Sequence, residues 1–218
     1  MIEYDQVQNF YILKGDKSIQ RGMKKEGIRT VTLYQRAHLS NAIKFCKSRR
    51  TAIDVGAHYG LMSYNIAQLF NSVHAFEIHP DVYSCLAKNV EHLQMNKVTT
   101  YPYGLGAEAK RVGLNIKPTK TFSTHVSEGG DEAEVKPLDE LELQDVDFIK
   151  MDAEGYEPLV VQGAINTIKR CKPVIFYECK GHETRFGYEQ NAVLELLKPF
   201  GYNTLGKLDK KNAVIGVR

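Results

Sequence analysis

Apolar residues follow two alternating patterns along the chain from residue 51 onward. Short unbroken apolar runs predict buried strands, because a strand that is covered on both faces has no polar side to show. Longer stretches place apolar residues three and four positions apart, which is typical of helices with one buried face. The runs predict strands at 51–56, 72–78, 98–105, 146–152 and 174–179, and the longer stretches predict helices at 61–70, 81–93, 156–171 and 189–202.

Strands that alternate with helices imply an α/β fold, with a mostly parallel sheet and helices on both of its faces. After residue 203, two apolar pieces flank the polar segment LDKKN. This pattern predicts a C-terminal hairpin that adds an antiparallel strand at or near one edge of the sheet. Before the last two predicted parallel strands, the alternation of strands and helices is interrupted. Two short strands are expected there instead, at 109–118 and 133–141, around a glycine-containing loop.

Residues 1–50 are expected to form a basic N-terminal extension with a helix near 34–47, ahead of a main domain at 51–218. Within the extension, residues 14–50 hold eleven Lys or Arg against two acidic residues, a charge of +9 in a chain whose net charge is +3. Such a surface would suit an acidic partner such as nucleic acid or a phosphorylated substrate. It equally fits a solvated helical surface, so the sequence leaves both interpretations open.

The composition is that of a globular chain, with 218 residues, 43% hydrophobic residues and 25% charged residues. No apolar run approaches the roughly 18 residues that span a membrane, and the start of the chain lacks the basic and apolar regions of a signal peptide. The four cysteines stand outside any C-x-x-C pair, so we expect free thiols, no disulfide framework and no zinc site. These features predict a cytoplasmic protein with no membrane partner.

The first concentrated chemical signal is the stretch IDVGAHYG at 53–60. A dinucleotide fingerprint would read G-x-G-x-x-G, but the spacing here is G-x-x-x-G with His58 in the middle, which disfavours a pyrophosphate. S-adenosylmethionine has no phosphate, and its cationic end would suit the carboxylate of Asp54 while backbone N–H groups take its own carboxylate. Gly60 is expected to let the following helix pack against the strand. The cofactor residues predicted in this loop are Asp54, Gly56, Ala57, His58, Tyr59 and Gly60.

Two further segments are expected to border the same cofactor. Glu77 ends the next strand, 21 residues after Gly56. An acid at about that distance grips a ribose diol in nucleoside-binding α/β folds. Ile78 would follow onto the adenine face. The third strand leads into a loop where Tyr103 and Gly104 are predicted to border the adenine.

A second constellation lies in VDFIKMDAEGYEP, at the end of a strand expected next to the cofactor strand. Asp152 could orient a substrate hydroxyl or amine, take a proton, or bind a metal with Glu154. Glu157 is expected to act only as an acid at a helix N-terminus. Glu178 ends another strand with His182 four residues later, which is either an acid–histidine pair for proton removal or a solvated histidine. The predicted catalytic residues are Asp152, Glu154 and His182, with no metal.

Together these motifs resemble the FkbM family of S-adenosylmethionine-dependent methyltransferases, over roughly residues 51–180. The resemblance rests on IDVGAHYG, FEIHP and above all IKMDAEGYEPLVVQGA. A strand ending in Lys-x-Asp-x-Glu-Gly-x-Glu, followed by a helix ending in Gly-Ala, is characteristic of that family. It implies a Rossmann-like class I methyltransferase fold and O-methylation of a sugar or small-molecule hydroxyl.

The resemblance also assigns positions. The matching residues are Asp54, Gly56 and Gly60 in the cofactor loop, Glu77 as the ribose acid, Lys150, Asp152, Glu154 and Gly155 in the central block, and Ser123 in a serine-bearing loop. His58 departs from the pattern, because the family usually has Asn there, so an imidazole would make that polar contact. Residues 1–50 match nothing in the family, and acceptor choice is expected to lie there.

Two alternatives stay open at this point. A nucleic-acid methyltransferase would use the basic N-terminal segment, although the Asn/Asp-Pro-Pro-aromatic signature of amine methylation is absent. A non-catalytic protein could instead retain only the pocket for S-adenosylmethionine. The loop at 122–130, which contains Gly129 and Gly130, is expected to act as a mobile lid.

Overall fold

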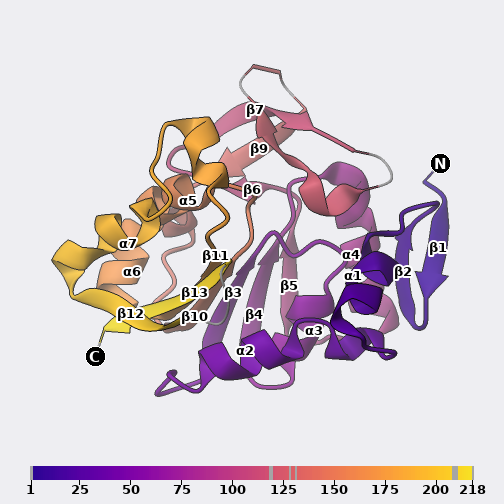
Figure 1. Ribbon diagram of the computed structural model, residues 1–218, viewed down its shortest axis with the longest axis horizontal. Helices are drawn as coiled ribbons and strands as arrows, with labels where there is room; N and C mark the ends of the chain where they lie inside the picture. The colour runs from indigo at the N-terminus through magenta and orange to yellow at the C-terminus, as the bar shows by residue number, and fades with distance from the viewer. Residues whose placement is uncertain (1, 118–119, 128, 131, 208–210, 218) are drawn as a thin grey trace.

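The computed structural model describes residues 2–117, 120–127, 129–130, 132–207 and 211–217. At its centre is a seven-stranded sheet with the order β12-β13-β11-β10-β3-β4-β5 (Figure 1). Its strands, in that order, are Tyr202–Lys207, Asn212–Val217, Val174–Glu178, Val146–Met151, Thr51–Val55, Ser72–Phe76 and Val98–Tyr101. The strand β3 at the middle is buried along its whole length, as its unbroken apolar pattern predicts.

Pairing directions confirm the predicted topology. β3 pairs in parallel with both β4 and β10, and β10 pairs in parallel with β11. β13 is antiparallel to β11 and to β12, so the C-terminal hairpin supplies the antiparallel strand that the sequence predicts. The strand expected at 98–105 is shorter than predicted: β5 ends at Tyr101, and Gly104–Leu105 forms a separate strand, β6, after Pro102. Proline has no N–H to donate, so it interrupts the ladder.

Helices cover both faces of the sheet. On one face lie α2 (Arg36–Ile43), α3 (Leu61–Ala67) and α4 (Pro80–His92), and on the other lie α5 (Glu157–Gly163), α6 (Ile165–Cys171) and α7 (Ala192–Leu197), which a 3₁₀ helix, η5 (Lys198–Phe200), continues. The single helix predicted at 156–171 is divided at Ala164. Gly163 lies against the carbonyl of Gly106, where an added Cβ would come within 1.8 Å of the oxygen. The chain therefore bends around this contact.

A smaller sheet stands over the carboxyl edge of the main sheet (Figure 1). Its order is β6-β9-β7-β8, with β7 at Lys110–Asn115, β8 at His125–Ser127 and β9 at Ala133–Lys136. The 3₁₀ helices η2 (Thr121–Ser123) and η3 (Leu138–Leu141) adjoin it. The predicted short strands at 109–118 and 133–141 correspond to β7 and β9, and β8 lies within the stretch that the sequence leaves as a loop.

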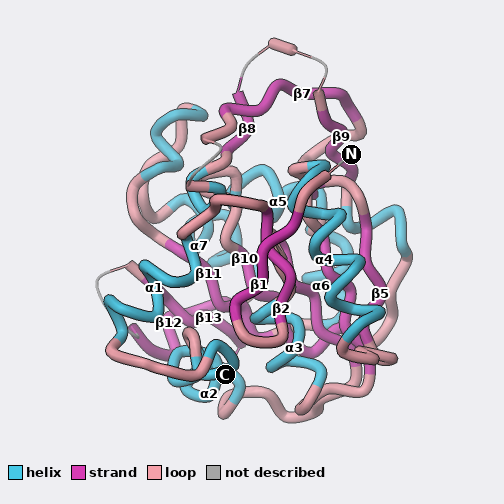
Figure 2. Tube along the Cα trace, turned by 90° about the vertical axis from the view of Figure 1, so that its right-hand side faces the viewer, coloured by secondary structure: helices cyan, strands magenta, loops and turns pink. Residues whose placement is uncertain are grey.

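The N-terminal segment holds more structure than the one predicted helix. It forms a hairpin of β1 (Tyr4–Val7) and β2 (Phe10–Leu13), then α1 (Ser18–Glu26), η1 (Val31–Leu33) and α2. The hairpin lies against α4 (Figure 2), where the buried Asn89 accepts from the N–H of Tyr11 and donates to its carbonyl. The amide of Asn89 also donates to the carbonyl of Tyr59 at 2.9 Å. The segment is thus tied to the main domain next to residues 56–60, the glycine loop after β3.

Among the described residues, no helix combines the length and the apolar character that crossing a membrane requires.

Candidate functional site

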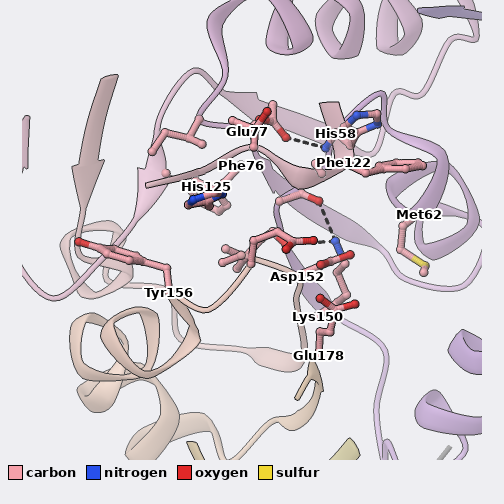
Figure 3. A pocket seen from close by; sticks show the side chains of 18 of the residues that line it. His58, Met62, Phe76, Glu77, Phe122, His125, Lys150, Asp152, Tyr156 and Glu178 are labelled. Atoms are coloured by element: carbon pink, nitrogen blue, oxygen red, sulfur yellow. Dashed lines mark hydrogen bonds between the residues drawn. The ribbon is translucent and has the colours of Figure 1, made fainter. Parts of the chain in front are cut away.

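A cavity of about 210 Å³ opens at the carboxyl edge of the sheet, where β3, β4, β10 and β11 end. Two groups of lining side chains lie at different strands. The β4 end of the cavity is formed by His58, Glu77, Ile78 and Gly104, and the β10 end is formed by Asp152, Glu154, Glu178 and Lys180. Figure 3 shows Glu77 and His58 together on one side, with Asp152 and Glu178 on the other.

The glycine loop brings the two ends together. The N–H groups of Gly56 and Ala57 both donate to the carbonyl of Phe76, at 3.0 and 2.9 Å, so they tie β3 to β4 and are not directed to a ligand. Gly56 has φ of +71°, and an added Cβ would lie 2.1 Å from the carbonyl oxygen of Asp152. Only glycine fits there, because the conformation is left-handed and another backbone crosses it.

Glu77 is the acid of the β4 end, and the main chain holds both of its oxygens. It is 7% exposed, and its two carboxylate oxygens accept the backbone N–H groups of His58 and His79, each at 2.8 Å (Figure 3). Burial raises the pKa of Glu77 to about 6, against the lowering effect of those two hydrogen bonds. Each oxygen keeps further acceptor capacity, since a carboxylate oxygen has two lone pairs.

Asp54 does not reach the cavity. Its Oδ1 lies 2.9 Å from Nζ of Lys150, its Oδ2 accepts the hydroxyl of Ser63, and the side chain is fully buried. Lys150 also donates to the carbonyls of Val55 and Gly56, and it does line the cavity. The predicted contact of Asp54 with a cofactor is therefore corrected. Its charge instead offsets that of Lys150, which in turn holds the glycine loop.

Two other predicted residues lie outside the cavity. Gly60 has φ of +84° at the start of α3, and an added Cβ would lie 2.8 Å from Leu86 of α4. It serves helix packing, although against α4 and not against the strand as predicted. The ring of Tyr103 lies 5.7 Å from that of Phe76, and Nζ of Lys136 lies over the Tyr103 ring at 4.9 Å. Tyr103 is not among the lining residues.

Charged side chains are concentrated at the β10 end. Lys180 contacts Glu178 directly and lies 3.7 Å from Glu154. Burial raises the pKa of Glu178 to about 8, and the nearby charge of Asp152 adds to this. Burial and Asp152 also raise the pKa of Glu154. Three carboxyl groups thus lie around the ammonium of Lys180, with the ammonium of Lys150 also near Asp152. Asp152 and Glu154 are both lining residues, as the sequence predicts.

His182 stands behind this group and does not line the cavity. Its Nδ1 lies 2.9 Å from Oε2 of Glu154, and burial lowers its pKa. In the observed arrangement it can orient Glu154 and is not itself a lining residue, so a direct catalytic role for His182 stays a prediction. The backbone of His182 also explains Gly155, whose added Cβ would lie 2.5 Å from the His182 carbonyl oxygen.

Glu157 has the structural role that the sequence predicts. As the first residue of α5, it accepts the N–H groups of Ala153 and Gly155, at 2.7 and 2.9 Å. Burial raises its pKa to about 8. Glu157 therefore shapes the loop that carries Asp152 and Glu154, and it is not a ligand group.

Sequence patterns did not identify several lining residues. They are Tyr34 and Gln35 from the N-terminal segment, Thr121 from the loop before β8, and Tyr156 and Lys180 from the loops after β10 and β11. Glu178, singled out at its strand end, and Phe122 and His125, from the loop expected to act as a lid, line the cavity as well. The ring of Phe122 stacks on Tyr34 at 6.0 Å and lies 4.3 Å from the ring of His58. Ser123 is not a lining residue, and its hydroxyl donates to the carbonyl of Lys120.

The strand order, with an antiparallel strand next to β11 and a cavity at the carboxyl edge beside a glycine loop, defines the Rossmann-like class I fold of methyltransferases. The model of the methyltransferase FkbM domain matches residues 54–204, and the chain belongs to that family of methyltransferases. No curated protein is significantly similar in sequence to this chain.

Solved structures agree with the fold. The methyltransferase FkbM from Methylobacillus flagellatus is 18% identical with a TM-score of 0.55, and the match covers 78% of this chain but only 44% of that protein. A putative O-methyltransferase from Klebsiella pneumoniae is 12% identical with a TM-score of 0.55, covering 95% and 92% of the two chains. A putative methyltransferase from Streptococcus mutans, solved in complex with SAH, is 14% identical with a TM-score of 0.51, covering 83% and 97%.

Proposed function

We propose that this protein transfers a methyl group from S-adenosylmethionine to a hydroxyl of a sugar or other small molecule. The observation that carries the proposal is a single cavity with a buried nucleoside-type acid, Glu77, at its β4 end and three carboxyl groups with a lysine at its β10 end. The family supports methyl transfer, and the polar β10 end supports a polyhydroxylated acceptor.

The β4 end fits the nucleoside. Glu77 retains acceptor capacity for the two ribose hydroxyls, since its oxygens are fixed by only one N–H each. Ile78 packs over Gly104 so closely that a Cβ at residue 104 would lie 2.9 Å from its Cδ1. This leaves a smooth apolar wall beside Glu77, which is what an adenine ring needs. The residues that would hold the cofactor are therefore Gly56, Ala57, His58, Tyr59, Glu77, Ile78 and Gly104.

The β10 end fits an acceptor hydroxyl. When bound, S-adenosylmethionine supplies an electrophilic methyl group, and the protein has to position an oxygen and remove its proton. Asp152 lies at the tip of β10 and is the residue that we assign to accept that proton. Glu154, Glu178 and Lys180 would hold neighbouring hydroxyls by charge-assisted hydrogen bonds.

Calorimetric titration with S-adenosylmethionine, S-adenosylhomocysteine and NAD tests the cofactor. We expect saturable binding of the first two and none of NAD. Glu77→Ala should weaken binding by at least about tenfold, since hydrogen bonds to a charged group contribute roughly 1.5–3 kcal/mol. Glu108→Ala, which removes an exposed carboxylate paired with Lys110, is the matched control and should bind as the wild type does. Unchanged affinity of Glu77→Ala would remove Glu77 from the site.

Nucleic acid is the second candidate acceptor, because α1 presents a basic outer face. Lys17, Arg21, Lys24 and Lys25 are exposed, while Ile19 and Met23 are buried. Phosphate contacts make binding fall steeply with ionic strength. The affinity of the protein for a single-stranded oligonucleotide would be measured at about 50 and about 200 mM salt. A fall of more than about tenfold, as several phosphate contacts produce, would favour this acceptor. Turnover of a glycan at a rate that does not change with salt would favour the sugar or small-molecule acceptor.

We also propose a cytoplasmic location. None of the four cysteines forms a disulfide, and proteins without disulfides are typical of a reducing compartment. To check the location, the protein would be isolated from cells under alkylating conditions and its thiols would be titrated. Oxidised cysteines would contradict a cytoplasmic location.

A further inference from the structure

Asp16 is a buried carboxylate with no part in the scheme above. It lies between β2 and α1, outside the residues that match the family, and it is 2% exposed. Asp is almost never fully buried unless its charge is satisfied. Its surroundings therefore need an explanation.

Four donors from three segments surround this carboxylate. Oδ1 accepts the N–H and the hydroxyl of Ser18, at 2.8 and 2.7 Å. Oδ2 accepts the hydroxyl of Tyr59 at 2.6 Å and that of Thr121. Burial alone would raise the pKa of Asp16, but the hydrogen bonds from Thr121, Tyr59 and Ser18 outweigh it and hold the pKa below its usual value. Asp16 is thus an ionised, acceptor-only group at neutral pH.

The hydrogen-bond inventory fixes the tautomer of His58. An ionised carboxylate cannot donate, so Thr121 gives its only hydroxyl proton to Asp16. The Nε2 of His58 lies 2.7 Å from the Thr121 hydroxyl oxygen, which must therefore accept. Nε2 then carries the imidazole proton, and Nδ1, which is buried and has no partner among the described residues, carries a lone pair. Burial lowers the pKa of His58 to about 3, so the ring stays neutral.

The position of His58 makes this matter for the cofactor. Its backbone N–H holds Glu77, and its ring lies between those of Tyr59 and Phe122, at 3.9 and 4.3 Å. His58, Tyr59, Thr121 and Phe122 all line the cavity. A positively charged ring here would repel the ammonium and sulfonium of S-adenosylmethionine, whereas a neutral one does not.

We propose that Asp16 is a positioning residue of the cofactor site: through Thr121 and Tyr59 it keeps His58 in the neutral Nε2–H form and holds the loop at 121–124 against the glycine loop. The N-terminal segment is then a working part of the site and not an appendage. This inference rests on the proposed function for the identity of the ligand. The arrangement of protons stands on the geometry alone.

The test compares Asp16→Asn with the wild-type protein. An asparagine has one acceptor oxygen and one donor nitrogen, so it cannot accept from all four donors. Titration with S-adenosylhomocysteine should show at least tenfold weaker binding. Imidazole ¹⁵N chemical shifts, which report the protonated ring nitrogen, should show His58 as Nε2–H in the wild type and a mixture of tautomers in the variant. Asp5→Asn, at an exposed acid of the same segment that accepts the Gly15 N–H, should change neither.

A double-mutant cycle with His58→Asn separates positioning from general stability. If Asp16 acts through His58, Asp16→Asn should weaken binding little further in the His58→Asn background. Equal losses in both backgrounds, or unchanged binding in Asp16→Asn, would overturn the proposal. If Asp16→Asn does not fold, Thr121→Val removes the linking hydroxyl at nearly constant volume and should give the same tautomer change and loss of affinity.

The two proposals fail in different ways. A wild-type protein that binds no S-adenosylhomocysteine would overturn the proposed function, while the ¹⁵N measurement would still decide the tautomer. A wild-type protein that binds it with His58 as Nδ1–H would overturn only the role of Asp16.

Discussion

The two ends of the cavity are built in different ways. At the β4 end the acid is held by the main chain, because Glu77 accepts N–H groups of His58 and His79. At the β10 end the charged groups hold one another, because Lys180 contacts Glu178 and His182 contacts Glu154 through side chains alone. One end is therefore set by backbone geometry, and the other by a balance of charges.

This difference indicates a division of labour. Groups that the backbone fixes need no rearrangement on binding, so the β4 end is suited to affinity. The β10 end has three carboxyl groups around the ammonium of Lys180, and burial together with the charge of Asp152 raises the pKa values of Glu178 and Glu154. Such groups are suited to proton transfer near neutral pH. We therefore expect changes at the β4 end to alter binding and changes at the β10 end to alter turnover.

The largest effect should come from Asp152→Asn at the β10 end. General base catalysis contributes on the order of 100- to 10,000-fold, so kcat with a glycan acceptor should fall by that factor. The affinity for S-adenosylhomocysteine, measured by calorimetry, should change by less than about twofold. Asp145→Asn, just before the same strand at the opposite edge of the sheet, is the control and should keep full turnover. Unchanged kcat in Asp152→Asn would remove Asp152 from the proton-transfer step, whereas a wild-type protein that binds the cofactor without any turnover would be a binder only.

The substitution Gly56→Ala should disturb both ends of the cavity and lower the stability of the fold. The added Cβ would lie 2.1 Å from the Asp152 carbonyl oxygen, so the glycine loop and the β10 loop must both move. Gly27→Ala is a matched control, because its φ of +66° is similar and nothing lies within 4 Å of its added Cβ. We expect Gly27→Ala to cost about 1 kcal/mol of unfolding free energy and Gly56→Ala about 2 kcal/mol more. Denaturant unfolding measures both, and equal losses would mean that the clash is absorbed without cost.

The β4 end was easier to predict from the sequence because backbone geometry sets it. A strand end, a glycine turn and an acid about twenty residues later are local patterns with fixed backbone consequences, so Gly56 and Glu77 were placed correctly in the cavity. Asp54 was misplaced because a strand alternates its faces, and its pairing with Lys150 depends on the register of β3 and β10. The helix at 156–171 was predicted unbroken because the contact of Gly163 with Gly106 is long-range.

Other parts of the cavity depended on tertiary structure. Lys180 and Tyr34 come from two distant segments, and neither carries a local signal of its destination. The hairpin at residues 4–13 was missed because its strands have only four residues each. The main sheet, in contrast, followed from apolar periodicity alone, since buried parallel strands leave the clearest pattern.

A third test sharpens the comparison through pH. Burial raises the pKa of Glu77 from 4.5 to about 6, so the folded state holds this proton more tightly than the unfolded state. That contribution to stability is complete below pH 4.5 and is lost as the pH rises through 6. Ligand binding has the opposite sign, because only the ionised carboxylate accepts both ribose hydroxyls. Affinity for S-adenosylhomocysteine should fall about tenfold from pH 7 to pH 5.

The control for this test is Glu77→Gln, which cannot titrate. Its weaker binding should be independent of pH in that window, since the pKa of His58 is about 3 and that of His79 is also lowered. Calorimetry at half-unit intervals of pH measures both proteins. A slope that persists in Glu77→Gln would assign the titration to the β10 end.

The smallest effect should come from removing divalent metals. Glu154, Glu178 and His182 offer ligand atoms within 4.8 Å of one another, which is a spacing that a metal could use. However, Lys180 already places an ammonium against Glu178 and near Glu154, and two cations would compete for the same oxygens. Turnover should therefore change by less than about twofold on treatment with a chelator. Lys180→Met should create an affinity for Mn²⁺ that calorimetry detects, and a wild-type enzyme that loses activity with chelator and regains it with Mg²⁺ would show that the metal, and not Lys180, balances these carboxylates.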